Sequence, residues 1–217
     1  MPNVIAFWII IIYSNYMKYR EFARKFPKTV FTFQEASLVD RELSVAGLRL
    51  QLHRWVKCGD LMRIRRGVYA FTDKAAPWQE QIRMIYPPAY ISCEAALAMH
   101  GIIPDAPFEQ TLVTPRNTRV FKTPWGRFVF RHIRAGLFTG YDPVTFLAEP
   151  EKAVLDYFYY HHARLHAEPL FWQEARWQNL SRLRWRRGER YLALYGKPVI
   201  ERLWRSLKEY AKTNQNY

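Results

Sequence analysis

From residue 17 onward, apolar positions recur with the three-to-four-residue spacing of a helix. The segment 17–26 places phenylalanines four residues apart and is followed by Pro27, which predicts a helix that ends there. Thr32 and Glu35 have the spacing of a capping box, in which two side chains satisfy the first backbone N–H groups of a helix. A second, short helix is therefore predicted over 33–39.

A third predicted helix has the clearest amphipathic pattern. Ser44 is a suitable N-terminal cap and Gly59 a suitable C-terminal stop. Between them, an apolar stripe recurs every three to four residues at Leu48, Leu52, Trp55 and Val56. Two short apolar runs, 61–64 and 68–71, then flank a turn and predict a β-hairpin. Three helices followed by a hairpin is the element order of a winged helix-turn-helix, a DNA-binding fold.

The rest of the chain mixes helical and strand patterns. The expected helices are 78–86, a segment that Ser92 caps and Gly101 ends, 147–160, 171–178 and 199–212. The expected strands are 110–114 and 127–133, and 116–122 is expected to be a loop. The fold class predicted is α+β. An N-terminal winged helix-turn-helix over 17–75 is followed by a mixed α+β domain over 76–217 that ends in helices.

The apolar opening, 4–13, resembles a membrane anchor only at first sight. It has ten residues, whereas a membrane-spanning helix needs about 20. It also lacks the basic flank and the small-residue cleavage site of a signal peptide. Two interpretations remain: a helix that packs on a partner or core, and an extension over 1–16 upstream of a natural start at Met17. The ordinary helix that begins at Met17 favours the second.

Net charge narrows the choice of partner. The chain carries 33 Lys and Arg against 19 Asp and Glu, a formal charge of +14, which favours nucleic acid over an anionic membrane. Residues 17–75 have 13 basic and 6 acidic side chains, 76–150 have 7 and 6, and 151–217 have 13 and 7. Two basic regions therefore flank a nearly neutral one. Cys58 and Cys93 both fall in helical patterns and are expected to be buried thiols in a reducing, cytoplasmic compartment.

The first basic region coincides with the third helix and the hairpin. In a winged helix, the third helix enters the major groove and the hairpin tip lies along phosphates or in the minor groove. Arginine suits guanine or phosphate, and glutamine can pair with adenine. The expected contacts to double-stranded DNA are Arg49, Gln51, His53, Arg54, Lys57, Arg63, Arg65 and Arg66. The alternative is a hairpin whose arginines only solvate an exposed turn.

The second basic region has its densest charge at 182–190. Arginines interleaved with tryptophan suit RNA, through stacking and phosphate contact. A solvated helix face explains the same pattern. The candidate RNA-contacting residues are Arg182, Arg184, Trp185, Arg186, Arg187 and Arg190.

The sequence contains no convincing active site. His162 and His166 lie one helical turn apart, but a third ligand and an activating carboxylate at zinc-site spacing are missing. Glu149, Glu151 and Lys152 fit a magnesium-dependent nuclease pattern only loosely, and capping of the predicted helix explains the carboxylates. We therefore expect no catalytic residue, no metal and no cofactor.

Three segments in order resemble one protein family. They are LHRWVKCGDLMRIRRGVYAF (52–71), YISCEAALAMHGI (90–102) and AEPEKAVLD (148–156). Together they are similar to the AbiEi-type antitoxins of type IV toxin–antitoxin systems, over about residues 20–160. The resemblance implies a winged helix that represses its own operon at promoter inverted repeats. It also implies an antitoxic C-terminal domain that opposes a nucleotidyltransferase-like toxin without forming a stable complex. The basic segment 182–190 lies beyond the resemblance and is a candidate for the antitoxic surface of that domain.

On this resemblance, the DNA contacts are Arg49, Arg54, Lys57, Arg63, Arg65 and Arg66. Two other functions fit the residues. One is a stand-alone winged-helix regulator whose second domain senses a ligand or dimerises. The other is a nuclease guided by its winged helix, which magnesium-dependent cleavage would establish.

Overall fold

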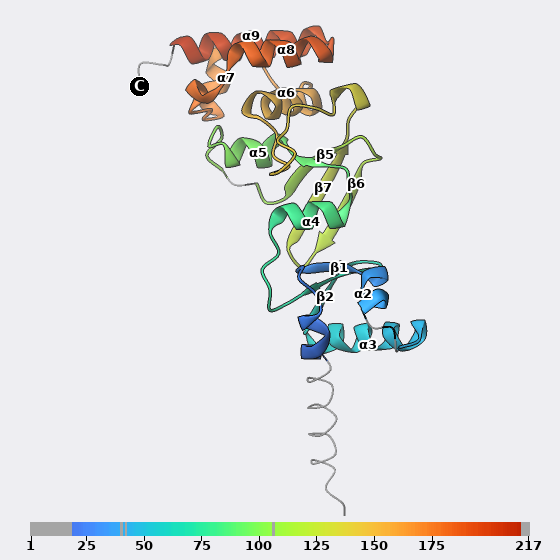
Figure 1. Ribbon diagram of the computed structural model, residues 1–217. Coiled ribbons are helices and arrows are strands. Elements are labelled where there is room, and N and C mark those ends of the chain that lie inside the picture. The colour runs from blue at the N-terminus through green and yellow to red at the C-terminus, as the bar shows by residue number, and fades with distance from the viewer. Residues whose placement is uncertain (1–18, 40, 42, 106, 214–217) are drawn as a thin grey trace, which may run out of the picture. The chain divides into compact units, whose positions relative to one another are not determined.

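The computed structural model describes residues 19–39, 41, 43–105 and 107–213 (Figure 1). The chain is a mixed α+β protein with two small sheets, as the sequence predicts. It divides into two compact units, one running to Ile85 and the other beginning at Tyr86. The predicted extension over 1–16 lies outside the described residues. Within the part of the chain that is described, no helix has the length and apolar character that a bilayer span requires.

The first unit combines helices with a three-stranded antiparallel sheet. After a helical segment at 19–24, its elements are β1 (Val30–Thr32), α2 (Phe33–Val39), α3 (Val45–Cys58), β2 (Leu61–Arg65), β3 (Val68–Phe71) and α4 (Trp78–Ile85). The strand order is β1-β3-β2, so the strand before α2 pairs with the second strand of the hairpin. The predicted helices over α2 and α3 and the hairpin are confirmed. Strand β1 was not predicted, because three residues are too few for a strand pattern to register.

Helices α2 and α3 have the caps that the sequence predicts. The Thr32 backbone N–H donates to the Glu35 carboxylate at 2.7 Å, and the Glu35 backbone N–H donates to Thr32 Oγ1 at 3.1 Å. This reciprocal pair is a capping box. Ser44 Oγ accepts from the Gly47 N–H at 3.1 Å, and Gly59 ends α3 in the left-handed conformation with φ 86°. Local hydrogen bonds thus set where both helices begin and where α3 ends.

An aromatic core holds α3 on the rest of the first unit. The buried cluster consists of Tyr19, Phe22, Phe26, Phe31, Ala36, Leu48, Leu52, Trp55, Leu61 and Phe71. The Phe22 and Trp55 ring centroids lie 4.8 Å apart. Because large rings gain most from burial, the apolar stripe of α3 is directed inward and its opposite face is exposed.

Helix α4 groups with the first unit, although the sequence predicts a boundary after residue 75. The Glu80 carboxylate accepts from the Val30 backbone N–H at 3.2 Å. Arg65 Nε donates to the Met84 carbonyl at 3.0 Å. These contacts connect α4 to β1 and to the hairpin, and none of them is visible in the local sequence pattern.

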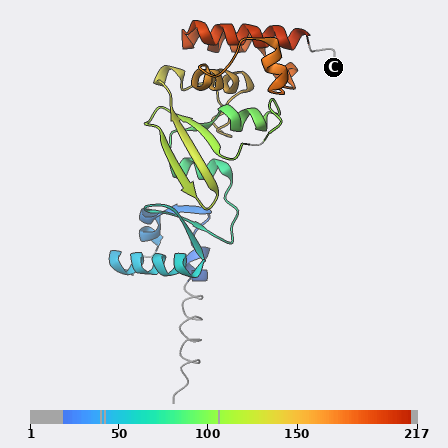
Figure 2. The same cartoon turned by 180° about the vertical axis from the view of Figure 1, so that it is seen from behind.

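The second unit has a four-stranded mixed sheet covered by helices (Figure 2). Its elements are β4 (Tyr90–Ile91), α5 (Cys93–Met99), β5 (Gln110–Thr114), β6 (Arg119–Thr123), β7 (Gly126–His132), η1 (Ala135–Leu137), α6 (Pro150–His161), α7 (Pro169–Glu174), η2 (Leu180–Arg182), α8 (Trp185–Tyr195) and α9 (Pro198–Thr213). The strand order is β4-β5-β7-β6, with β5 and β7 parallel and the outer pairs antiparallel. Helix α5 packs on β5 and α6, and α8 and α9 pack on α6.

Three sequence predictions about the second sheet, the start of α5 and the cysteines are wrong. The segment 116–122 is not all loop, because most of β6 falls within it and pairs with β7 at the sheet edge. Ser92 precedes α5 but does not cap it; its hydroxyl donates instead to Asp156 at 2.8 Å. Cys58 is exposed, because it lies on the flank of α3 rather than within the buried stripe, whereas Cys93 is buried as predicted.

Candidate nucleic-acid interface and a buried network

One face of α3 is exposed and basic. It carries Arg49, His53, Arg54 and Lys57, all exposed, and α3 contains no Asp or Glu. The opposite face is held by the aromatic core, so the direction in which these side chains extend is set by packing. The exposed face of α3 is therefore a rigid, positively charged surface.

Two of the predicted DNA-contacting residues of α3, Arg49 and Gln51, differ from the others in what surrounds their side chains. The Arg49 guanidinium lies 5.5 Å from the centroid of the Phe33 ring, a cation–π distance that positions it toward the start of α2. Gln51 is half-buried, and its Nε2 is buried without a hydrogen-bond partner among the described residues. The structure therefore places Gln51 at the side of the basic face rather than on it.

The hairpin presents three exposed arginines in two different settings. Gly67 has φ 76°, a conformation that favours glycine and closes the turn between β2 and β3. Arg65 donates to the Met84 carbonyl of α4. Arg63 and Arg66 are exposed and have no side-chain partner in the described part of the chain. They are the two hairpin residues most available to a ligand.

The second basic region is partly committed to packing. Arg182 Nη1 donates to the His100 carbonyl at 2.8 Å, and Arg187 pairs with Glu149 at 2.6 Å. Trp185 is half-buried and meets the Trp204 ring edge-on at 5.1 Å. Three of the six predicted residues thus stabilise the second unit.

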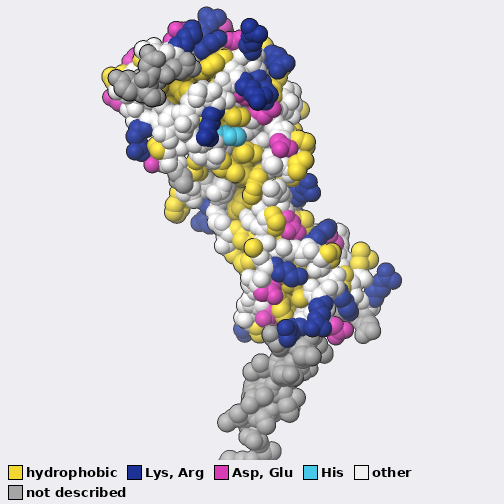
Figure 3. Space-filling view, turned by 60° about the vertical axis from the view of Figure 1, so that its left-hand side comes forward, with side chains coloured by type: hydrophobic (Ala, Val, Ile, Leu, Met, Phe, Trp, Pro, Cys, Tyr) yellow, Lys and Arg dark blue, Asp and Glu magenta, His cyan; other side chains and the backbone are white. Residues whose placement is uncertain are grey.

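The other three, Arg184, Arg186 and Arg190, have exposed side chains without a partner among the described residues. Figure 3 shows dark blue basic side chains over α8 and α9 next to magenta acidic ones. Lys208 of α9 pairs with Glu189 of α8 at 2.5 Å. The second basic region is therefore a mixed surface, unlike the acid-free face of α3.

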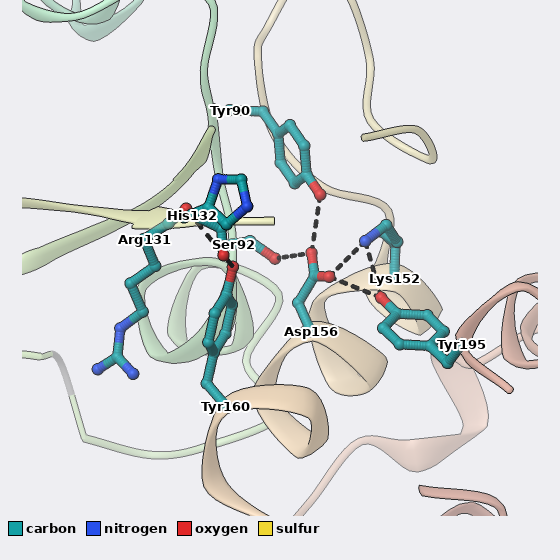
Figure 4. A network of polar contacts seen from close by, with 8 residues as sticks. All are labelled: Tyr90, Ser92, Arg131, His132, Lys152, Asp156, Tyr160 and Tyr195. Carbon is teal, nitrogen blue, oxygen red and sulfur yellow. Dashed lines mark hydrogen bonds and ion pairs between the residues drawn. The ribbon is translucent and has the colours of Figure 1, made fainter. Parts of the chain in front are cut away.

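The second unit also buries an ionic network that the sequence did not predict (Figure 4). Lys152 and Asp156 form an ion pair one helical turn apart on α6, with side chains 1% and 0% exposed. Asp156 accepts hydrogen bonds from Tyr90 at 2.9 Å, Ser92 at 2.8 Å and Tyr195 at 2.6 Å. Lys152 also donates to the Tyr195 hydroxyl at 2.8 Å. The network connects β4, α6 and α8.

The hydrogen bonds that Lys152 and Asp156 make explain how this charged pair can be buried. An unpaired buried ion costs several kcal/mol, whereas a pair with its remaining hydrogen bonds made offsets most of that cost. Burial, followed by the negative charge of Asp156, raises the pKa of both Tyr90 and Tyr195 well above the ordinary value. Both phenols therefore remain protonated donors, and the network is a structural feature of the second unit.

The two carboxylates that open α6 do not cap it, contrary to the sequence prediction. Glu149 accepts from the Tyr191 hydroxyl at 2.7 Å and pairs with Arg187. Glu151 accepts from the Arg184 backbone N–H. Both side chains bind the segment around α8, because α8 packs directly on α6. Burial and the hydrogen bond to Glu149 raise the pKa of Tyr191 to about 12.

The histidines of the second unit have separate surroundings. His161 Nε2 lies 2.8 Å from a Glu94 carboxylate oxygen of α5. His162 Nδ1 contacts the Tyr159 carbonyl at 3.0 Å. Across the described ranges, no three His, Cys, Asp or Glu residues lie close enough together to hold a metal ion.

Comparison with known proteins adds no assignment. No protein-family model matches the chain, and a search of curated proteins finds no match.

Proposed function

We propose that the chain binds double-stranded DNA through its first unit, acting as a winged helix-turn-helix. The observation that carries this proposal is the exposed, acid-free face of α3, which bears Arg49, His53, Arg54 and Lys57 above a buried apolar stripe. Two further observations support it: the hairpin that follows α3 exposes Arg63 and Arg66, and a short strand before α2 joins the hairpin in one sheet.

The dimensions of α3 suit a major groove. A helix with its side chains is about 10–12 Å across, and the major groove of B-DNA is about 12 Å wide. Phosphate contacts from the flanks of α3 and from the hairpin would set its register, and side chains at the centre of the exposed face would contact base edges.

We further propose that the chain is an antitoxin and autorepressor of a type IV toxin–antitoxin operon. The three antitoxin-like segments support this role, in the order the family has them. The first forms the end of α3 and the hairpin, and the other two meet where Tyr90 and Ser92 donate to Asp156. The second unit would then oppose a nucleotidyltransferase-like toxin without a stable complex, and no catalytic role is assigned to it.

The DNA-binding proposal is tested with the full-length protein and a pool of random-sequence duplexes. Selection should enrich a duplex whose binding weakens steeply with salt, because each neutralised phosphate contributes about 0.9 to the slope. The triple variant Arg49→Ala, Arg54→Ala, Lys57→Ala should abolish binding. A control with the same charge loss is Arg164→Ala, Lys197→Ala, Arg202→Ala, three exposed residues of the second unit. An equal loss of DNA affinity in both variants would show that binding depends only on net positive charge and not on the face of α3.

The antitoxic role is tested by identifying the genes that flank this one and co-expressing the full-length chain with any nucleotidyltransferase-like protein that they encode. Cells should survive only when the chain is present. The α3 triple variant should still rescue them, because the proposed antitoxic activity belongs to the second unit. Death of cells that contain a well-folded chain would leave a stand-alone DNA-binding regulator as the function.

A further inference from the structure

Leu50 is an exposed apolar side chain in the middle of the basic face of α3. It is 52% exposed, whereas the two other leucines of the helix, Leu48 and Leu52, are at most 1% exposed. An isolated exposed leucine is common, but one that lies among the three cations Arg49, Arg54 and Lys57 gains nothing from the fold. Its place on the helix indicates what it contacts.

Helical geometry puts Leu50 between two arginines. At about 100° per residue, Arg49 lies about 100° to one side of Leu50 and Arg54 about 40° to the other. Lys57 lies about 20° from it, two turns further along. Leu50 is also in the first half of α3, the part of a recognition helix that contacts base edges.

We propose that Leu50 is a specificity-determining residue that packs against the C5-methyl group of a thymine in the major groove. This inference rests on the proposed DNA-binding function. The thymine methyl is the one apolar group that a base pair presents in that groove. Phosphates and the other base-edge groups are polar and suit the neighbouring arginines. The bound sequence should therefore contain a T·A pair opposite Leu50.

A second copy of the chain is the other occupant to weigh, because Leu38, Leu43 and Val45 are also exposed, at 66%, 40% and 55%. Charge argues against it. Pairing two copies through this face would bring Arg49, Arg54 and Lys57 against the same residues of the other copy, and like charges oppose such an interface. A polyanion removes that repulsion.

The experiment uses the full-length protein and the duplex enriched by selection. Each thymine in turn is replaced by deoxyuridine, which removes only the C5-methyl group. Replacement at one position should weaken binding about fourfold, since a buried methyl-sized group is worth about that factor. For Leu50→Ala, the same replacement should have no effect. Leu194→Ala, an exposed leucine of α8 in the second unit, should keep the fourfold difference.

Two failures are distinguishable. If no duplex is enriched and binding does not depend on salt, the proposed function fails. If a duplex is bound but no deoxyuridine weakens it, or if Leu50→Ala keeps the full deoxyuridine effect, only the role of Leu50 fails. The deoxyuridine series needs no variant, so a folding defect in Leu50→Ala could not rescue the proposal. A change of oligomeric state in Leu50→Ala with unchanged DNA preference would also overturn it.

Discussion

Single residues decide how closely two helices of the second unit approach. Gly188 lies on α8, where a Cβ atom would stand 2.1 Å from Cζ2 of Trp204 on α9. Trp204 is itself 1% exposed and has Trp185 against its ring. Such a distance leaves no room for even one methyl group, so glycine is required here by packing and not by backbone conformation.

Gly188→Ala should therefore destabilise the protein by about 1–3 kcal/mol, because the Trp204 ring must move from a filled core. The higher helix propensity of alanine, about 1 kcal/mol, offsets only part of this. Urea unfolding followed by tryptophan fluorescence measures the change. Gly136→Ala is the matched control, since a Cβ there meets nothing within 4 Å. Equal stability of the two variants would contradict the packing argument.

The two arginines on the flanks of α3 should have different roles. They are five residues apart, which separates them by about 140° around the helix, so they cannot both face the groove floor. Arg49 extends toward Phe33 at the start of α2, the helix that would cross the DNA backbone in the proposed winged helix-turn-helix. Arg54 lies closer than Arg49 to the direction of Leu50 around the helix axis.

Arg54→Ala should cost about 1–3 kcal/mol of binding free energy and relax preference at one base pair. Arg49→Ala should weaken all sequences alike. Binding-site selection with each variant gives the two preference profiles. Identical profiles would show that the flanks of α3 are not distinguished.

At the scale of elements, α4 contacts the hairpin and thereby changes which hairpin arginines are available to a ligand. The sequence predicts that Arg63, Arg65 and Arg66 of the hairpin all contact DNA. Because Arg65 donates to the Met84 carbonyl of α4, Arg63 and Arg66 are the better candidates in the structure.

Arg63→Ala with Arg66→Ala should lower the salt dependence of DNA binding by about 2 in slope, since each phosphate contact contributes about 0.9. Sequence preference should survive, because phosphates carry no sequence information. Titrations at several salt concentrations measure the slope. The pair Arg164→Ala and Arg202→Ala, exposed residues of the second unit, should leave it unchanged. An unchanged slope in the hairpin variant would exclude phosphate contact there.

At the scale of the whole molecule, the buried network gives the second unit a pH limit on its alkaline side. Burial first, and Asp156 next, raise the pKa of Tyr90 and Tyr195 well above the ordinary 10.0. Burial also raises the pKa of Tyr160, whose hydroxyl donates to the His132 carbonyl at 2.7 Å. The folded chain therefore keeps protons that the unfolded chain loses above pH 10.

Stability should thus be complete below about pH 10 and fall above it, by about 1.4 kcal/mol per pH unit for each such tyrosine. Urea unfolding at a series of alkaline pH values measures the decline, and tyrosinate absorbance counts the phenols that ionise before unfolding. Tyr90→Phe removes one of these phenols and should reduce the slope. Ionisation of every tyrosine near pH 10 in the still-folded protein would contradict the prediction.

The sequence by itself determined the features that depend on near neighbours. The capping box of Thr32 and Glu35, the limits of α3 at Ser44 and Gly59, and the hairpin are all visible in it. Each depends on hydrogen bonds or periodicity within a few residues, which local composition encodes directly.

Only the tertiary structure decided which distant groups these elements would meet. Ser92 reads as a helix cap but donates to Asp156, 64 residues away, because the sheet and α6 bring the two together. Gln51 reads as a base-contacting residue, but packing leaves its amide nitrogen buried. A serine hydroxyl or a glutamine amide can bind a nearby backbone group or ligand, or a distant group of the fold. Which of these it does depends on burial across the whole chain, and no local sequence pattern records that burial.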